Sequence, residues 1–113
     1  MEGGRKMGEY FVVLITTSTE REASQIARVL VESQLAGCVN IIQGIRSIYR
    51  WQGKIEDEAE VLMIVKTRRD LFAELTRRVK ELHSYTVPEI ISLPITDGSG
   101  EYLGWLEGAT RKT

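Results

Sequence analysis

The side chains best suited to bind a soft metal ion are Cys38 and His83, each the only residue of its type in the chain. A thiolate suits Cu(I), and an imidazole suits Cu(II) or Zn(II). The CxxC and HExxH spacings of zinc sites are absent, so these donors need to converge in space or receive help from another subunit. Each residue also has a structural interpretation. Packing as a small hydrophobe is favoured for Cys38, and His83 could equally cap helix carbonyls.

A second group combines polar and aromatic residues at the ends of expected strands and helices: Trp51, Lys66, Tyr85 and Glu89. Such groups often line a cleft for a small molecule. The favoured alternative is a buried Lys66–Glu89 pair with tyrosine hydrogen bonds that fix a subunit interface.

Two further stretches, 56–60 and 98–100, could bind ions but are interpreted as structural. The acidic run 56–58 with Glu60 lacks the ligand spacing and the turn glycine of an EF-hand, which predicts a solvated hairpin loop. Residues 98–100 precede a helix, but Leu103 breaks a GxGxxG pattern, so an ordinary helix cap is expected. Because no catalytic triad is legible and the chain has one histidine, we expect no enzyme.

The elements that position these residues follow from the spacing of apolar residues. The pattern predicts strands at 10–16, 38–51, around 61–67 and at 90–95. Helices are expected from residues 18–19 to Gly37, over 69–82, and after Ser99. The order β-α-β-β-α-β with a short C-terminal helix predicts an α+β fold of the ferredoxin-like, split βαβ type.

Local signals set the expected boundaries. Thr19 and Glu22 have the spacing of a capping box, in which each side chain accepts from a backbone N–H at the helix start. Gly37 is expected to end that helix in a left-handed conformation. Gly44 marks a bulge where the apolar alternation changes phase, and a turn is expected at 52–54.

Length and composition bound the class of protein. The chain has 113 residues, net charge −1 and a pI near 5.9, which suits one domain, 9–113, after a flexible leader, 1–8. The sequence has no basic stripe, so nothing in it favours binding to nucleic acid. No apolar run reaches the ~18 residues of a membrane span or resembles a signal peptide. A single cysteine suits a reducing compartment, and we expect a cytoplasmic protein.

Two features of the predicted sheet indicate self-association. A 14-residue strand at 38–51 would extend about 46 Å, whereas a domain of this length is roughly 34 Å across. Strands 10–16 and 61–67 are apolar on both faces, yet two helices cover only one face of the sheet. The other face would expose a large apolar patch, so an oligomer is predicted.

The residues resemble those of the CutA family, the divalent-cation tolerance proteins. Five motifs carry the resemblance in order: Cys38-Val39-Asn40-Ile41, Ser47-x-Tyr49-x-Trp51-x-Gly53, Lys66-Thr67, His83-x-Tyr85-x-x-Pro88-Glu89-Ile90 and Tyr102-Leu103-x-Trp105. The match runs from about Tyr10 to Leu106. Ser84 departs from the proline of many relatives, which should loosen the local turn and could move His83.

The resemblance implies a cytoplasmic, non-enzymatic homotrimer linked to tolerance of copper and other divalent metals. Weak metal binding through His83, with Cys38 nearby, is expected without an organic cofactor. The assembly is similar to that of the PII signalling proteins. The alternative function is therefore a PII-like trimer that binds a small anionic metabolite or a partner protein at a cleft around Lys66, Tyr85 and Glu89.

Overall fold

The computed structural model describes residues 9–112, so the predicted leader 1–8 lies outside the described residues. The elements in chain order are β1 (Tyr10–Thr17), α1 (Glu20–Glu32), β2 (Cys38–Trp51), β3 (Lys54–Arg68), a 3-10 turn (Arg69–Leu71), α2 (Phe72–Leu82), β4 (Ile90–Pro94) and α3 (Gly100–Ala109). This order confirms the predicted ferredoxin-like fold. Within the described range, no helix combines the length and apolarity that crossing a bilayer requires.

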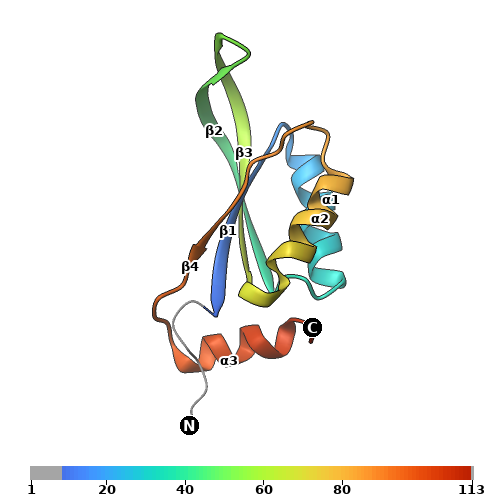
Figure 1. Cartoon of the computed structure of the whole chain (residues 1–113), viewed down its shortest axis with the longest axis vertical. Helices are drawn as coiled ribbons and strands as arrows, with labels where there is room; N and C mark the ends of the chain where they lie inside the picture. The colour runs from blue at the N-terminus through green and yellow to red at the C-terminus, as the bar shows by residue number, and fades with distance from the viewer. Residues whose placement is uncertain (1–8, 113) are drawn as a thin grey trace.

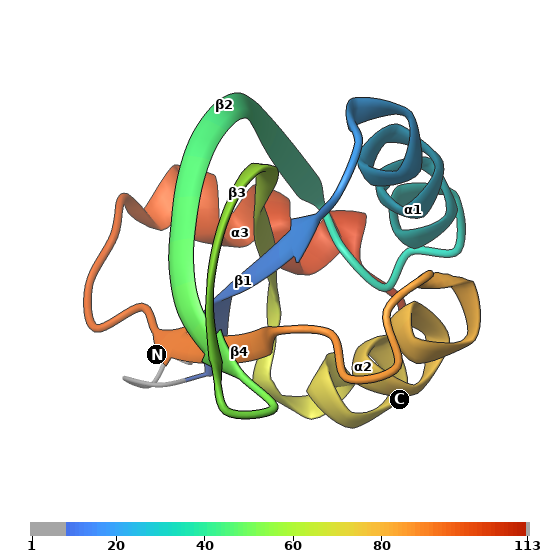
Figure 2. The same ribbon diagram turned by 90° about the horizontal axis from the view of Figure 1, so that it is seen from above.

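The four strands form one antiparallel sheet in the order β2-β3-β1-β4. Helices α1 and α2 lie side by side on one face of this sheet, and α3 lies across one end of it (Figure 1). The view from above also places α1 and α2 on the same side of the strands (Figure 2). The sheet is therefore a layer with one face against helices and two outer strands, β2 and β4.

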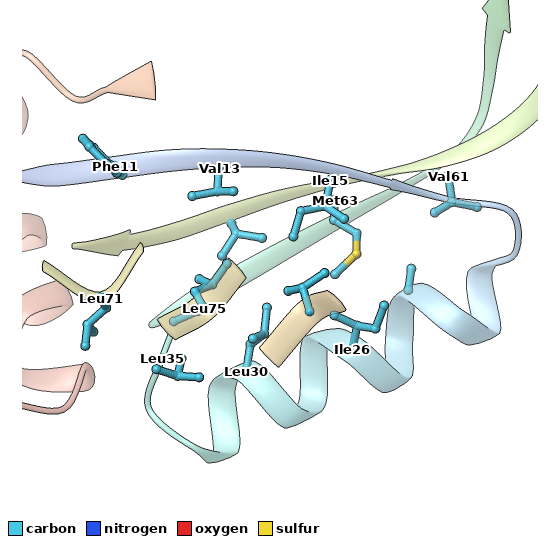
Figure 3. Packing of buried hydrophobic residues seen from close by; sticks show 14 residues of the cluster. Phe11, Val13, Ile15, Ile26, Leu30, Leu35, Val61, Met63, Leu71 and Leu75 are labelled. Atoms are coloured by element: carbon cyan, nitrogen blue, oxygen red, sulfur yellow. The ribbon is translucent and has the colours of Figure 1, made fainter. Parts of the chain in front are cut away.

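The core forms where alternate residues of β1 and β3 point toward the two helices (Figure 3). Its largest fully buried side chains include Val13, Ile15, Ile26, Leu30, Met63, Val65, Leu71, Leu75 and Val79. Each fully buried aliphatic side chain of this size contributes about 1.5–3 kcal/mol of hydrophobic stabilisation. This predicted helix-facing layer is what holds β1 and β3 in register.

The start of α1 forms only half of the predicted capping box. Thr19 is the N-cap, and its hydroxyl accepts from the Glu22 backbone N–H at 3.1 Å. The Glu22 carboxylate does not return the bond to Thr19, because it accepts instead from the backbone N–H of Ser84 at 2.7 Å. Glu22 therefore ties the start of α1 to the segment after α2.

Gly37 does not end α1 in a left-handed conformation, which corrects the prediction. The positive φ, 62°, belongs to Gln34, just after the helix. Gly37 is required for a different reason, because a Cβ at this position would lie 2.6 Å from Cδ1 of buried Leu106 on α3. Glycine here permits close approach of α3 to the chain entering β2.

The β2–β3 hairpin projects well beyond the rest of the domain (Figure 1). The ladder between β1 and β3 ends at the pair Thr17–Val61, so residues 45–60 of the hairpin pair only with each other. The molecule measures 52 × 25 × 22 Å as a result. The predicted bulge is confirmed at Gly44, where φ is 78° and the register shifts, and Gln52 with Gly53 makes the predicted tight turn.

The sheet face opposite α1 and α2, called the open face below, is apolar along most of its length. Strand register places seven apolar side chains on it: Val12, Leu14, Ile42, Leu62, Ile64, Ile91 and Leu93. Ile42, Ile91 and Leu93 are 44%, 50% and 51% exposed. The expectation of an uncovered apolar face on this subunit is confirmed.

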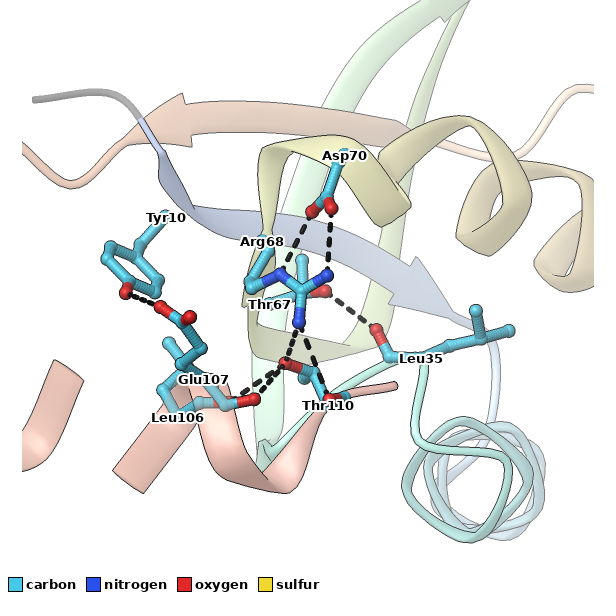
Figure 4. A network of polar contacts seen from close by, with 8 residues as sticks. All are labelled: Tyr10, Leu35, Thr67, Arg68, Asp70, Leu106, Glu107 and Thr110. Atoms are coloured by element: carbon cyan, nitrogen blue, oxygen red, sulfur yellow. Dashed lines mark hydrogen bonds and ion pairs between the residues drawn. The ribbon is translucent and has the colours of Figure 1, made fainter. Parts of the chain in front are cut away.

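Helix α3 is held at the end of the sheet by Leu103 and Leu106, which pack on Tyr10, and by a polar network (Figure 4). Arg68 donates to both carboxylate oxygens of Asp70, at 2.9 and 2.8 Å, and to the Thr110 hydroxyl at 3.0 Å. Ser99 caps α3 as predicted. The buried Arg68 and Thr110 thereby fix the end of α3 to the start of the 3-10 turn.

Gly37→Ala should lower the free energy of unfolding by about 1–3 kcal/mol, because the new methyl group overpacks against Leu106. Gly108→Ala is the matched control within α3. A Cβ there meets nothing within 4 Å, so the change should raise stability by up to about 1 kcal/mol through helix propensity. Urea unfolding of both variants measures the difference, and shifts of the same sign would contradict the close-approach role.

Candidate functional site

A cleft of about 770 Å³ lies where the hairpin leaves the body of the domain. One wall comes from β2 and β3 of the hairpin, and the other from residues 84–89, which connect α2 to β4 and cross the strands at this level (Figure 1). The lining residues are Thr16, Arg46, Ser47, Ile48, Tyr49, Trp51, Glu60, Ser84, Tyr85, Thr86, Val87 and Glu89. Its size is typical of a pocket for a small organic molecule.

The structure brings together three of the four residues predicted to share a cleft. Trp51, Tyr85 and Glu89 all line it, whereas Lys66 does not. Lys66 faces Cys38 across the β2–β3 ladder, and its ammonium donates to the side chain of Asn40. The alternative Lys66–Glu89 pair does not form within one subunit, because Lys66 lies level with Leu93 of β4 whereas Glu89 precedes Ile90 at the other end of that strand. A pair between subunits stays a prediction.

Glu60 and Tyr85 form the buried polar pair of the cleft. Glu60 is only 8% exposed, and the Tyr85 hydroxyl donates to its Oε2 at 2.5 Å. Burial and the neighbouring Glu60 carboxylate raise the pKa of Tyr85, which keeps the phenol protonated as a donor. The prediction that Glu60 belongs to a solvated loop is wrong, because β3 begins at Lys54 and carries Glu60 to the base of the hairpin.

A second tyrosine–carboxylate pair lies further along the hairpin. The Tyr49 hydroxyl donates to Glu58 at 2.5 Å, and this bond with the nearby carboxylates raises the pKa of Tyr49 to about 12. Arg46, the only Lys or Arg among the described lining residues, makes a two-pronged pair with Asp57 at 2.8 and 2.6 Å. The guanidinium is thus already neutralised by a hairpin carboxylate.

His83 fixes the wall of the cleft to the body of the domain. Its side chain has no exposed surface, and its Nε2 lies 2.7 Å from the Thr16 carbonyl oxygen. Its Nδ1 accepts from the backbone N–H of Tyr85 at 3.0 Å, which assigns the proton to Nε2. Both ring nitrogens are engaged, so a metal ion would have to displace one of these hydrogen bonds.

Cys38 lies apart from His83 in this subunit. It is partly exposed at the start of β2, with Sγ 3.9 Å from Oδ1 of Asn40. Cys38 pairs with Lys66 of β3. His83 contacts Thr16, which pairs with Leu62 of the same strand. Lys66 and Leu62 are four residues apart, so the two donors lie at levels of the sheet separated by about 13 Å. Nowhere in residues 9–112 do three or more His, Cys, Asp or Glu side chains gather closely enough to hold a metal ion.

Sequence reasoning missed Arg46, Tyr49 and Glu60 as cleft residues. The Tyr49–Glu58 contact could have been predicted from the sequence. Counting residues back from the turn pairs Tyr49 with Glu56 and places Glu58 on the same face of the hairpin. The Tyr85–Glu60 contact has no comparable local signal. It joins residues that lie far apart along the chain and depends on the path of the 84–89 connection.

Fold and site together define a class of protein: a PII-like, ferredoxin-like subunit with a long β2–β3 hairpin and a cleft at its base. A family model described as CutA1 divalent ion tolerance protein matches residues 11–109, and the chain belongs to this family. A curated relative from Thermus thermophilus, "Divalent-cation tolerance protein CutA", is 54% identical over 99 residues, which cover 88% of this chain and 96% of that protein.

Solved structures agree with this membership. A divalent cation tolerance protein from Thermus thermophilus superimposes with a TM-score of 0.88 at 53% identity and covers 90% of this chain and 99% of that one. CutA1 from Oryza sativa gives a TM-score of 0.91 at 42% identity, with 95% and 98% covered. The names of these relatives describe cation tolerance or the family itself, and none is an enzyme name.

The relatives differ in length and compartment. "Protein CutA, chloroplastic" from Arabidopsis thaliana is 44% identical over 111 residues, and this chain spans 61% of its length. A solved relative from Archaeoglobus fulgidus is described as periplasmic. Membership of the family therefore does not fix the compartment of this chain.

Tyr85→Phe should lower the free energy of unfolding by about 1–2 kcal/mol, because it leaves the buried Glu60 carboxylate without its donor. Tyr49→Phe is the matched control, since it removes the same phenol–carboxylate bond at an exposed position and should cost less than about 0.5 kcal/mol. Chemical denaturation measures both. Equal costs would show that the Tyr85–Glu60 pair is not the buried anchor of the cleft.

Proposed function

We propose that this protein acts in tolerance of divalent cations as a non-catalytic homotrimer that binds copper or a related ion weakly. Membership of the CutA1 divalent ion tolerance family supports the cation-related role. The observation that carries the assembly is the uncovered apolar open face. The two parts of the proposal are tested separately below.

Trimer formation would bury the open face and give hydrogen-bond partners to the backbone groups of the outer strands. An apolar sheet face of this extent is a liability for a lone subunit in water. Strands β2 and β4 each have one side without a strand neighbour among residues 9–112, which leaves backbone groups available for pairing with another subunit. The overhanging hairpin has exposed Ile48 and Ile55, which are suited to contact a neighbouring copy.

Metal binding is proposed at Cys38 and His83, each repeated three times in the trimer. Cys38 is the more accessible donor, because it is partly exposed beside the open face, and its sulfur suits Cu(I). His83 would bind Cu(II) only by giving up its bond to Thr16 or to the Tyr85 N–H. This competition supports weak rather than tight binding at His83.

The non-catalytic role is supported by the state of the one histidine. Both nitrogens of His83 serve structural hydrogen bonds, so the imidazole lacks a free position for proton transfer. We also propose a cytoplasmic location, for which the single unpaired cysteine is the supporting feature. Cell fractionation with an antibody to the chain tests the location, and recovery in a periplasmic or plastid fraction would refute it.

The alternative of a small anionic metabolite in the cleft receives less support. Lys66, the cation expected to attract it, lies outside the cleft. The cleft lining has two carboxylates, Glu60 and Glu89, and one arginine, Arg46, whose charge is already paired with Asp57. A negative lining repels an anion, so metal tolerance remains the favoured function.

The wild-type chain should sediment at micromolar concentration with three times the 12.8 kDa of one subunit. Ile91→Lys places a charge on the open face, on the outer strand β4, and should dissociate the assembly, because a buried unpaired lysine costs several kcal/mol. Val31→Lys, on the outer surface of α1, is the control and should remain trimeric. A folded wild-type monomer would refute the assembly.

Cys38→Ser should abolish Cu(I) binding measured against a chromogenic chelator, because a hydroxyl is a poor ligand for a soft ion. His83→Asn should weaken Cu(II) binding measured by titration and leave Cu(I) binding intact. The two variants serve as controls for one another. Unchanged affinities would remove both residues as ligands, and loss of both ions in either variant would contradict separate sites.

A further inference from the structure

The charge of the cleft selects a class of ligand that metal tolerance does not explain. Glu60 reaches the base of the cleft with more than nine tenths of its surface buried, and Glu89 lies on the opposite wall. Among residues 9–112, neither carboxylate forms an ion pair with a lysine or arginine. A buried carboxylate without a cationic partner is costly, and a bound cation would compensate it.

The pKa values of Tyr49 and Tyr85 reflect the same negative electrostatic potential. The carboxylates of Glu58 and Glu60 contribute to the raised pKa of both Tyr49 and Tyr85. The hydroxyls donate to these carboxylates but do not neutralise them. Because Arg46 is held by Asp57, the field at the centre of the cleft stays negative.

The walls add aromatic surface to this charge. Trp51, Tyr49 and Tyr85 all line the cleft, and Trp51 is 45% exposed. The face of an aromatic ring attracts a cation, tryptophan most strongly. Ammonium and guanidinium groups are the species that benefit from a carboxylate and a ring together.

The same residues are poorly suited to a bare metal ion. Glu58 and Glu60 are two positions apart on one strand face, about 7 Å along β3, and no set of three acidic, histidine or cysteine side chains converges in the described chain. A volume of about 770 Å³ also exceeds the needs of a single ion. Size, charge and aromatic lining together point to an organic cation.

We propose that the cleft between the base of the β2–β3 hairpin and residues 84–89 binds a small organic cation that carries an ammonium or guanidinium group. Glu60 pairs with the cationic head, and Trp51 covers its apolar part. Glu89 adds a second negative charge at the rim. The proposal does not require metal binding at Cys38 or His83, because neither residue lines the cleft. Copper at His83 would nevertheless disturb the cleft, because it would displace a hydrogen bond to Thr16 or Tyr85, which both line it.

N-Butylguanidinium is the probe, titrated into the ¹⁵N-labelled full chain and followed by amide chemical shifts. Saturable shifts are expected at residues 46–51, at Glu60 and at 84–89. N-Butylurea has nearly the same shape without charge, and pentanoate is the anionic counterpart. Neither should produce saturable shifts at these positions.

Glu60→Gln keeps an acceptor for Tyr85 and removes the charge, and should weaken the probe's affinity about tenfold or more. Trp51→Leu removes the ring and should weaken binding about threefold to tenfold. Glu32→Gln and Trp105→Leu are the matched controls at exposed positions on α1 and α3, and should bind the probe as the wild type does.

Several outcomes would overturn the proposal. A flat titration would show that the cleft is not a ligand site, as when a neighbouring subunit fills it. Equal binding of N-butylurea would show that charge does not select the ligand. Binding of pentanoate alone would reverse the assigned sign. Shifts confined to other surfaces, or unchanged affinity in both Glu60→Gln and Trp51→Leu, would remove the assigned residues.

Discussion

The structure depends on a sheet that is apolar on both faces while only two helices cover it. Alternate residues of β1 and β3 face α1 and α2 and form the core, and the intervening residues form the open face. Because β1 and β3 are the two central strands, neither face can be made polar without changing the strands that hold the fold. Burial of the second face by other copies is the simplest way to meet this constraint.

The unequal lengths of the strands create the cleft. Strand β1 has 8 residues, whereas β2 and β3 have 14 and 15, so the hairpin continues past the end of the core. Glu60 lies one residue beyond the last β1 pair, at Val61, where the connection from α2 crosses. His83 fastens that connection to Thr16, and this bond places Tyr85 over Glu60. The histidine thus shapes the cleft without entering it.

Local sequence signals predicted most of the fold and three of the cleft residues, but not the contacts that build the cleft. The bounds of β2, the bulge at Gly44 and the Ser99 cap follow from short-range patterns that act within a few residues. Gly37 was misread because its constraint comes from Leu106, far along the chain. The Lys66–Asn40 and Tyr85–Glu60 contacts were not predicted for the same reason: side-chain pairs depend on strand register and on the path of distant connections.

Cys38, the proposed donor for a soft ion, and the proposed organic-cation cleft occupy opposite ends of the sheet. Cys38 pairs with Lys66 near the end covered by α3, whereas Glu60 lies at the base of the hairpin. Six residues of β3 separate these positions, about 20 Å at the rise of an extended strand. Direct interaction between a soft ion at the thiol and an organic cation at the carboxylate would be largely screened at that distance in physiological salt. Any coupling between them would therefore pass through the assembly, since the open face and the hairpin that supplies the cleft wall are both surfaces that a neighbouring copy would contact.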